Sequence, residues 1–478
     1  MIHLEALVAA ATRHAAPSAE RVIRPRGAPW AVADLAARVR ALAPPVLEGS
    51  ANAVVRGVAF ADAADQLAAT LAAWEAGDAV LPLDPAMPLD RLVARATALG
   101  AASLSTDAGV FVHPLSGAED ATGWALALPR PEVPDRRPTI RYTAEALETC
   151  LAEGVEALGD SVRVGLLRPP RSVGTLVLDV LAPLVSGGSV VLVCDLTWPS
   201  SRLDLLAVAG ADAIVGAPEH LLALARAALD RPPADRPALK TVVCESGPFT
   251  PALATLVREA FPGVGLQRRY GSDAVCPLIA RALASPDDGA PPARLFAFGG
   301  RTAVVVDAAG YPCRAGQTGL LRVRGPGLSR PAPDDAGLED RCTGDLFDVQ
   351  AEGALLAVGR ADDQVRIEGT PVHPSRIAAH LRRSPGVDDA MVVPVVDPWG
   401  TTRLVAFVVS DIPAAALAPE LTRSLRAALD GPERPHRVVV RRELPRGALG
   451  APDLAALARL AEHALGGPDA PTPDSNAD

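Results

Sequence analysis

The stretch RCTGDLFDVQAEGALLAVGRADDQVRIEG, residues 341–369, decides the fold of this chain. It holds two alternating apolar runs, one ending at Val358 and one over 365–367, separated by a polar elbow with a glycine, an arginine and two aspartates. This alternation predicts two short strands joined by a charged turn. The Thr-Gly pair before Asp345 predicts a carboxylate on a tight turn just before a strand, where it can bind a diol.

Bulk composition describes a globular chain with more than one domain. Its 478 residues exceed the usual size of a single hydrophobic core, and 49% of them are hydrophobic. A net charge of -10 argues against nucleic acid or an anionic membrane as a partner. The N-terminus lacks the basic start and apolar block of a signal peptide, and no apolar stretch is long enough to span a bilayer. We therefore expect a cytoplasmic protein.

Two residue types restrict the possible chemistry. The six cysteines are scattered without CxxC spacing, which indicates neither a zinc site nor a disulfide scaffold. All 46 basic residues except Lys240 are arginine. A function that needs a lysine ammonium after residue 240 is therefore excluded.

Apolar periodicity predicts strands and helices in alternation through most of the chain. Helices are expected over 30–43 and 62–77, on either side of a buried strand over 54–60. A strand, a helix and a second strand are expected within 162–195, and a strand–helix unit within 211–228. Strands that alternate with helices of this length are typical of βαβ units and mostly parallel sheets, so the predicted fold class is multi-domain α/β.

Residues 341–369 resemble the hinge region of the adenylate-forming superfamily, which includes acyl-CoA synthetases, luciferases and the adenylation domains of nonribosomal peptide synthetases. The segment VLPLDPAMPLDRLVARATALGA, residues 80–101, resembles an element of the peptide-synthetase adenylation domains in particular. Matching elements follow in the right order over about 25–461. The resemblance therefore covers nearly all of the chain.

The resemblance implies a large domain and a small domain. Residues 1–361 would form the large N-terminal domain, with two βαβ sheets and a distorted β-barrel to which 317–330 contributes a hairpin. Residues 362–465 would form a small α+β C-terminal domain that rotates about a hinge at Asp362. The Pro- and Asp-rich tail, 466–478, is expected to be disordered.

The resemblance assigns nucleoside binding to residues that this chain retains. In the family, the Thr-Gly-Asp aspartate and the Gly-Arg arginine hold the ribose hydroxyls of AMP. The segment LQRRYGSDAV, 266–275, resembles the element whose tyrosine stacks near adenine and whose hydroxyl residue faces the phosphate. The implied residues for residual AMP or adenosine binding are Tyr270, Gly271, Ser272, Asp345 and Arg360.

The family's motifs that bind the triphosphate and the activated carboxylate have no match in this sequence. The segment LALPRPEVPDRRPTIRYTAEALE, 126–148, stands where the family has a glycine-rich phosphate loop, but it has four prolines before Thr143 and no glycine. Proline has no N–H donor, so this segment is a poor backbone site for an anion. Ala451 occupies the position of the catalytic lysine. We therefore expect neither standard carboxylate activation nor a required cofactor.

The magnesium position of the family has two interpretations here. Counting from Tyr270 and Gly271 without a gap puts Asp273 and Ala274 where the threonine and the metal-binding glutamate are expected, which removes the metal site. A one-residue deletion instead leaves Ser272 and Asp273 as a hydroxyl–acid pair, and Asp273 can then hold a metal because hard cations prefer carboxylate oxygen. Both registers remain open.

The helix within 162–195 matches the helix that lines the acyl pocket of the family. Amino-acid-activating relatives carry an aspartate near its start, which binds the α-amino group of the substrate. Gly174 stands at that position, so an α-amino acid substrate is not expected. The implied substrate-pocket residues are Gly174, Thr175 and Leu178.

Gly369 matches the position that the pantetheine arm passes during thioester formation in the family. The resemblance therefore implies an acyl or peptidyl carrier protein, or an acyl thioester, as the partner. One hypothesis is a repurposed enzyme of natural-product biosynthesis that binds or processes such a thioester without ATP. The polar groups available for this chemistry are Asp273, His220 and Cys276, which show no recognisable nucleophile–base arrangement.

Two further hypotheses belong to other classes. The chain can be a non-catalytic partner or scaffold that keeps the fold without the reaction. It can also be an active AMP-forming ligase with displaced catalytic groups, because arginine holds phosphate in a bidentate manner. No arginine can be placed at Ala451, which argues against the ligase.

Overall fold

The computed structural model of the protein describes residues 20–45, 47, 52–112, 121–128, 140–159, 162–245, 249–285, 294–330, 340–363, 365–367, 370–396, 402–429, 431–445 and 452–465. Backbone contacts divide the chain into two compact units. The first contains the described parts of 1–248, 256–303 and 322–343, and the second contains those of 249–255, 304–321 and 344–478. The expected boundary after residue 361 falls inside the second unit and stays a prediction.

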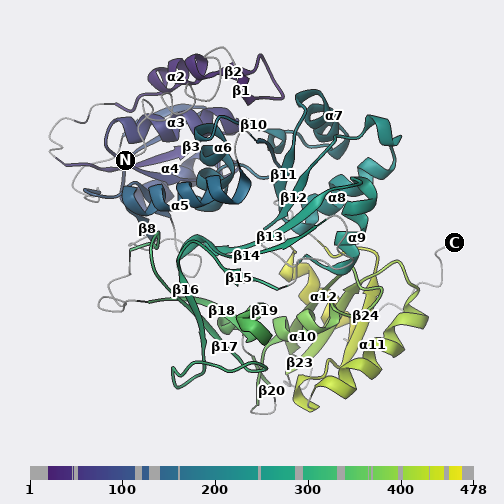
Figure 1. Ribbon diagram of the computed structural model, residues 1–478. Helices are drawn as coiled ribbons and strands as arrows, with labels where there is room; N and C mark the ends of the chain where they lie inside the picture. Colours follow the sequence, from purple (N-terminus) through teal and green to yellow (C-terminus); the bar gives the residue numbers. More distant parts are fainter. Residues whose placement is uncertain are drawn as a thin grey trace. The chain divides into compact units, whose positions relative to one another are not determined.

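The first unit contains a nine-stranded sheet whose central strands are parallel (Figure 1). In spatial order its strands are β15 (Phe296–Ala297), β14 (Cys276–Ala284), β13 (Gly265–Ser272), β12 (Thr241–Cys244), β11 (Ala213–Gly216), β9 (Arg163–Leu166), β10 (Ser189–Val191), β1 (Glu20–Ile23) and β2 (Trp30–Ala31). All pairs from β13 to β1 are parallel, whereas β14, β15 and β2 pair antiparallel. The central strands are rich in buried valine and isoleucine, as parallel strands covered on both faces must be.

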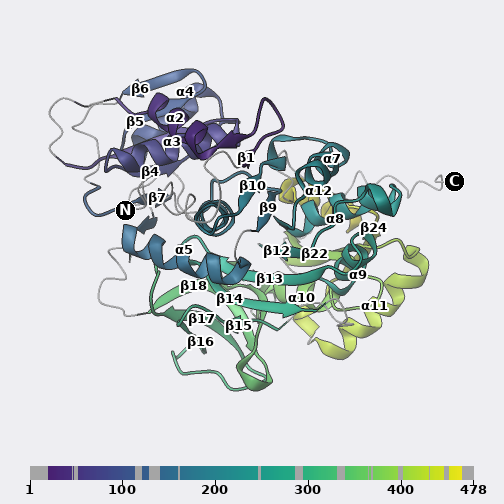
Figure 2. The same cartoon turned by 45° about the horizontal axis from the view of Figure 1, so that its top comes forward.

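Helical segments connect the strands of this sheet. They are α5 (Ala144–Leu158), η2 (Gly174–Leu181), α6 (Ala182–Val185), α7 (Pro199–Ala209), α8 (Pro218–Leu229) and α9 (Pro251–Ala260). Helix α5 begins at Thr143, whose hydroxyl accepts the N–H of Ala146 at 3.2 Å, as a helix N-cap should. It packs along η2 and α6 (Figures 1 and 2).

A six-stranded sheet forms the second layer of the first unit. In spatial order its strands are β6 (Gly109–Val112), β5 (Ala101–Thr106), β3 (Val55–Ala59), β4 (Ala79–Pro82), β7 (Leu126–Leu128) and β8 (Ile140–Tyr142). Helices α3 (Ala63–Glu75) and α4 (Leu89–Ala98) pack against it, and α2 (Val32–Ala41) packs on α3 (Figure 2). The predicted elements at 30–43, 54–60 and 62–77 are confirmed.

The C-terminal part of the second unit is a three-stranded sheet covered on both faces. Its strands are β22 (Asp389–Val396), β23 (Thr402–Val409) and β24 (Arg437–Arg441). Alternate residues of β23 enter two separate apolar clusters because successive side chains of a strand point to opposite faces. One cluster includes α10 (Pro374–Leu381) and α11 (Ala414–Ala428), and the other includes α12 (Leu454–Ala464).

Residues 341–369 form three strands, not two. They are β18 (Arg341–Val349), β19 (Leu355–Arg360) and β20 (Val365–Ile367). β18 and β19 pair antiparallel in a four-stranded sheet with β16 (Thr302–Val306) and β17 (Thr318–Arg324), while β20 pairs with β21 (Thr370–Val372). The charged turn therefore connects two sheets. The expectation that Asp345 precedes a strand is wrong, because the residue lies within β18.

The helix expected within 162–195 has an unexpected form. Over Gly174–Leu181 it is a π-helix, in which backbone hydrogen bonds join residues i and i+5, and every residue of it is buried. Burial on all sides leaves no apolar stripe from which a helical period can be read. The following strand ends at Val191, earlier than expected. A 3-10 turn over Val193–Asp195 follows it, and Oδ2 of Asp195 accepts the N–H of Ala63 at 3.2 Å.

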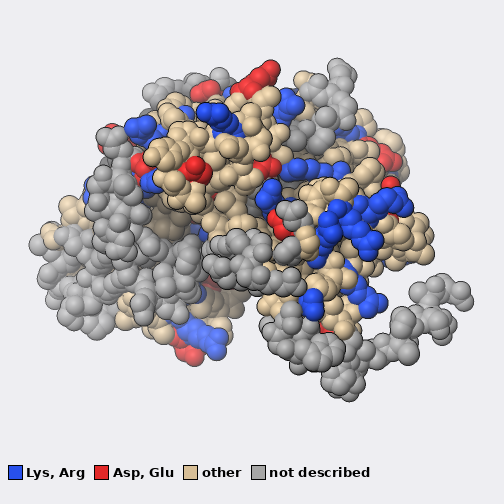
Figure 3. All heavy atoms as spheres, turned by 90° about the horizontal axis from the view of Figure 1, so that it is seen from below, with Lys and Arg blue, Asp and Glu red and all other residues tan. Residues whose placement is uncertain are grey.

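The surface is not uniformly acidic, despite the net charge of -10. Figure 3 shows Lys and Arg side chains gathered on one side of the face that it draws. The edge strand β24 exposes Arg437 and Arg441, and Arg442 follows it on the surface. No helix in the described part of the chain has both the length and the apolar character needed to cross a membrane.

Candidate functional site

A cavity of about 130 Å³ opens in the first unit at the carboxyl ends of β9, β12 and β13. The chain continues from β9 to β10 on one side of β9 and then to β11 on the other, which makes this edge a topological switch point. Open α/β sheets bind ligands at such points. The cavity is lined by Arg168, Ser172, Gly174, Glu245, Arg269, Gly271, Asp273 and Pro277.

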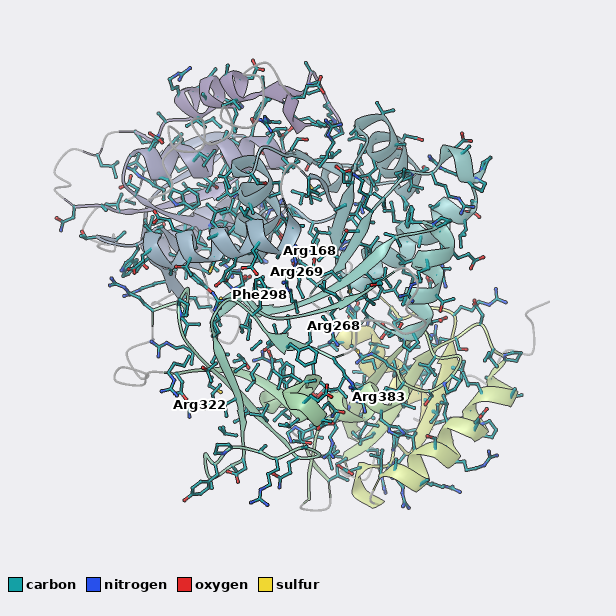
Figure 4. The ribbon with its side chains drawn as sticks, viewed as in Figure 1. Arg168, Arg268, Arg269, Phe298, Arg322 and Arg383 are labelled. Atoms are coloured by element: carbon teal, nitrogen blue, oxygen red, sulfur yellow. The ribbon has the colours of Figure 1, made fainter. Side chains whose placement is uncertain are left out.

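An ion pair between Arg168 and Glu245 forms one wall of this cavity. Nη2 of Arg168 contacts Oε1 of Glu245 and also donates to Oγ1 of Thr175 at 3.3 Å. Figure 4 shows Arg168 near Arg269, which lines the same cavity from β13. Within the described residues, no hydrogen-bond partner is found for Oε2 of Glu245. The carboxylate is thus fixed through one oxygen, and the other remains an acceptor.

The start of the helix that contains η2 forms a second wall. Oγ of Ser172 accepts the N–H of Thr175 at 3.0 Å, and Oδ1 of Asp273 accepts the N–H of Val173 at 3.2 Å. These bonds satisfy donors that a helix N-terminus otherwise leaves open. Burial raises the pKa of Asp273, and the nearby charge of Arg168 opposes that shift. The Asp273 carboxylate therefore caps a helix, and its predicted catalytic and metal-binding roles stay predictions.

A buried ion pair lies behind the cavity. Nη1 of Arg269 is 2.6 Å from Oδ1 of Asp179 in η2, and the two side chains are 2% and 0% exposed. Burial raises the pKa of Asp179 to about 7, with a further rise from the charge of Glu245 and an opposing effect of Arg269. Charges that are removed from water in this way are kept only where they are paired.

Asp179→Asn is expected to change how stability depends on pH. The pKa of Asp179 lies well above its ordinary value of 3.8, so between about pH 4 and pH 7 the folded chain holds a proton that the unfolded chain releases. The contribution of Asp179 to the free energy of unfolding therefore falls as pH rises through this window. The stability of the wild type relative to the variant should fall by a few kcal/mol across this window, since one pKa unit is worth about 1.4 kcal/mol.

Urea denaturation at half-unit pH steps measures this difference. Asp204→Asn, which changes a carboxyl that is 67% exposed, is the control for removing a carboxylate at the surface. A constant difference between wild type and Asp179→Asn from pH 4 to pH 8 would contradict the raised pKa.

The three residues predicted for the substrate pocket have different positions. Gly174 lines the cavity, and Thr175 bonds to the side chains of Ser172 and Arg168 in its wall. Leu178 is 1% exposed and lies in an apolar cluster with Leu278 and Phe298, away from the lining. The structure thus brings two of the three together at the cavity.

The residues matched to the adenine-binding element lie at the end of β13. A bulge falls between Tyr270 and Ser272, and Ser272 is the register partner of Cys276 on β14. Gly271 lines the cavity, and a side chain there would collide with the backbone carbonyl of Pro277. The close approach of β14 therefore accounts for the glycine on structural grounds alone.

His220 and Cys276 do not line the cavity. His220 lies in the first turn of α8, and its N–H donates to the carbonyl of Ala217 at 3.0 Å. Cys276 is fully buried, with its Sγ 3.9 Å from Sγ of Cys150. Burial opposes ionisation of Cys276, but the hydrogen bond with Cys150 and the charge of Arg301 outweigh it and lower the pKa of the thiol.

Asp345 and Arg360 are brought together in the second unit. They are register partners on β18 and β19, and Nη1 of Arg360 lies 3.2 Å from Oδ1 of Asp345. Gly344 has a φ of +77°, and its missing side chain leaves room for the guanidinium of Arg360. The Asp345 side chain is 19% exposed. Their predicted role in holding ribose stays a prediction.

Other predicted positions lie outside the described residues: Gly369, Ala451 and the segment 129–139. The backbone of Asp362 lies in the 3-10 turn η7 (Ala361–Asp363), and its side chain is not described. The described part of the chain contains no group of three or more His, Cys, Asp or Glu side chains arranged to hold a metal ion.

Sequence reasoning missed the charged residues of the cavity. Arg168, Glu245 and Arg269 were not predicted, and neither was the buried partner Asp179. A signal was present, since Asp179 interrupts an apolar helix and Arg269 lies in the buried part of β13. Charged residues at such positions are rarely buried without a partner or a function.

Comparisons with known proteins identify the family. Residues 139–331 match the AMP-binding enzyme model, and residues 377–450 match the model of the AMP-binding enzyme C-terminal domain. The chain belongs to the adenylate-forming superfamily. Among solved structures, the amide bond synthetase McbA of Marinactinospora thermotolerans shares the fold, with a TM-score of 0.76, 22% identity, and coverage of 96% of this chain and 99% of the other.

Peptide synthetases are among the sequence relatives of this adenylate-forming protein. The phosphinothricin tripeptide synthetase PhsC of Streptomyces viridochromogenes is 30% identical over 84% of this chain and 40% of its own length. The isonitrile lipopeptide synthase of Streptomyces coeruleorubidus is 43% identical over 32% of this chain and 10% of its own. The chain thus spans less than half the length of these curated relatives. The predicted family and α/β fold class are confirmed, and the chain is related to adenylation domains of natural-product biosynthesis.

Proposed function

We propose that this protein binds or processes an acyl group delivered as a carrier-protein or pantetheine-linked thioester, without the standard ATP-dependent activation of a carboxylate. The distribution of lysine carries the proposal. Lys240 is the one lysine of the chain, it is 79% exposed, and its Nζ lies 2.7 Å from Oδ1 of Asp212. The resemblance implies that the family's catalytic lysine, whose ammonium stabilises the charge that develops during adenylation, lies after residue 240. This chain has no lysine in that part of the sequence.

The position of Lys240 in the sheet also supports the proposal. It immediately precedes β12, whereas Glu245 immediately follows that strand and lines the cavity. Five residues of extended chain span roughly 16 Å. The one ammonium group is thus at the opposite edge of the sheet from the cavity, and all cationic side chains in the lining are guanidinium groups.

The size of the cavity favours an acyl group as its ligand. A volume of about 130 Å³ corresponds to roughly four water molecules in the liquid. Pockets for larger ligands have volumes of roughly 300–1,000 Å³. The relationship to peptide synthetases supports delivery of this acyl group on a carrier protein.

A non-catalytic partner protein is the second candidate function. The observation that favours it is the burial, hydrogen bonding and position of the three polar groups considered for catalysis. Cys276 is fully buried, the Asp273 carboxylate caps a helix, and His220 is absent from the cavity lining. Of these three groups, Asp273 alone lines the cavity, and its Oδ1 already accepts the N–H of Val173.

Gly369→Leu tests the proposed delivery of a pantetheine arm. The leucine side chain should obstruct the predicted channel and lower the affinity for acyl-pantetheine thioesters by at least tenfold, with little change in melting temperature. Calorimetric titration without ATP gives the affinity, and thermal denaturation gives the stability.

Gly431→Leu is the matched control, because a side chain at Gly431 enters open space. It should change neither quantity. Unchanged affinity in Gly369→Leu, or equal losses of affinity and stability, would return Gly369 to a structural role. Wild-type protein that binds no thioester at all would argue for the non-catalytic partner.

A further inference from the structure

Five of the eight residues that line the cavity have polar or charged side chains. Among its eight residues, Pro277 alone offers an apolar side chain, and the others are arginine, aspartate, glutamate, serine and glycine. An aliphatic or aromatic acyl chain would remove water from these groups without replacing their hydrogen bonds. The chemistry of the wall therefore selects against the apolar acyl groups that the volume alone would admit.

Glu245 offers one hydrogen-bond acceptor to this space. Its Oε1 is fixed by Arg168, and a Cβ built on Gly174 would lie 3.9 Å from its Oε2. The same Cβ would lie 3.8 Å from Oγ of Ser172 and 3.9 Å from Cβ of Pro277. Oε2 of Glu245 therefore lies beside the space that Gly174 leaves open.

The charges around this acceptor favour a neutral donor. The negative charge of Glu245 is already paired with Arg168, and Arg269, in the same lining, is paired with Asp179. An ammonium ion beside Oε2 would meet the positive charge of Arg168, and a ligand carboxylate would meet Glu245 and Asp273. A hydroxyl donates one hydrogen bond and adds no charge.

We propose that the cavity selects a short hydroxyacyl group, whose hydroxyl donates a hydrogen bond to Oε2 of Glu245. The inference rests on the proposed function and makes Glu245 a specificity-determining residue, with Gly174 providing the space. A cavity of about 150 Å³ holds benzene, so the acyl group has roughly six non-hydrogen atoms or fewer. A four-carbon hydroxyacyl chain meets both requirements.

Calorimetry with a panel of pantetheine thioesters tests the inference on the 478-residue chain. The acyl groups are 3-hydroxybutyryl, butyryl, 3-aminobutyryl, hexanoyl and hydroxyacetyl. The 3-hydroxybutyryl thioester should bind at least tenfold more tightly than the butyryl thioester, because a hydrogen bond to a charged group typically contributes that much. Equal or tighter binding of the butyryl or hexanoyl thioester overturns the inference, and so does first rank for the 3-aminobutyryl thioester.

Two variants test whether the preference for the 3-hydroxybutyryl thioester arises in the cavity. Glu245→Met removes the acceptor and should abolish the preference for 3-hydroxybutyryl over butyryl. Gly174→Ala adds a methyl group at ordinary contact distances, so it should keep the fold, weaken 3-hydroxybutyryl binding at least tenfold and spare the shorter hydroxyacetyl thioester. The controls Glu259→Gln, on the surface of α9, and Gly431→Ala should leave the ranking unchanged.

The binding measurements distinguish failure of the hydroxyacyl inference from failure of the proposed function. Thioesters that bind in an order set by apolar length refute the hydroxyacyl inference and leave the proposed function standing. A Gly174→Ala variant that keeps full affinity for the 3-hydroxybutyryl thioester also refutes the inference. If no thioester of the panel binds to the wild type, the proposed function fails, and the inference fails with it.

Discussion

Purified protein is expected to show no ATP–pyrophosphate exchange above background with any carboxylic acid. The resemblance to the family predicts that Ala451 occupies the position of its catalytic lysine, and no lysine follows residue 240 to replace it. The segment 129–139, which is predicted to occupy the position of the phosphate loop, has four prolines and no glycine. Each missing charge-stabilising donor typically costs about 10²–10³-fold in rate, so the two losses together should remove measurable exchange.

Exchange of radiolabelled pyrophosphate with a panel of acids is the measurement. Asp345→Asn is the informative variant, because it removes the carboxylate predicted to hold ribose while keeping a side chain of similar size. Strong exchange by the wild type that this variant abolishes would show an active ligase and refute the proposed function. Ala451→Lys provides the positive test, since any exchange that it restores identifies the missing ammonium as one of the lost donors.

Arg269→Leu is expected to lower the free energy of unfolding by about 3–5 kcal/mol at pH 8, which is typical when one partner of a buried ion pair is removed. The Asp179 side chain is 0% exposed, and its Oδ1 lies 2.6 Å from Nη1 of Arg269 in the wild type. The substitution would leave this buried carboxylate without its ion-pair partner. The double variant Asp179→Leu/Arg269→Met should recover most of the loss, because it replaces both charges with apolar groups. Urea denaturation of the wild type and the two variants measures the loss and its recovery.

Lys240→Ala is the control for this comparison, because it breaks an ion pair with Asp212 in which the lysine is 79% exposed. It should cause no measurable change. If Arg269→Leu were as stable as the wild type, the ion pair with Asp179 would contribute nothing to stability. If the double variant were no more stable than Arg269→Leu, the loss would come from packing and not from the unpaired charge.

Much of the fold is predictable because its local signals agree. Polar–apolar alternation and turn residues identify β19 and β20, and helical periodicity identifies α2 and α3. The strand order is not predictable from these signals, because pairing across the nine-stranded sheet depends on contacts between distant residues. Asp345 was assigned to a turn for the same reason: the Thr-Gly pair resembles a turn signal, but antiparallel pairing with β19 keeps this segment extended.

The candidate site was less predictable than the fold. Gly174 and Asp273 were identified from motif positions, and both line the cavity. Glu245 and Arg168 were missed, because each follows a different strand and only the parallel sheet brings their side chains together. Motif matching identifies residues that relatives share, whereas a charge pair particular to this chain has to be found in three dimensions.

The π-helix over Gly174–Leu181 has a consequence for how such a protein can diverge. A π-turn contains one residue more than an α-turn, so a one-residue deletion within this helix can be absorbed by reversion to α-helical hydrogen bonding. The deletion would rotate one part of the segment relative to the other and present different side chains beside Gly174. A lineage could thus change the shape of this cavity in one mutational step, without replacing Arg168, Glu245 or the strands that precede them.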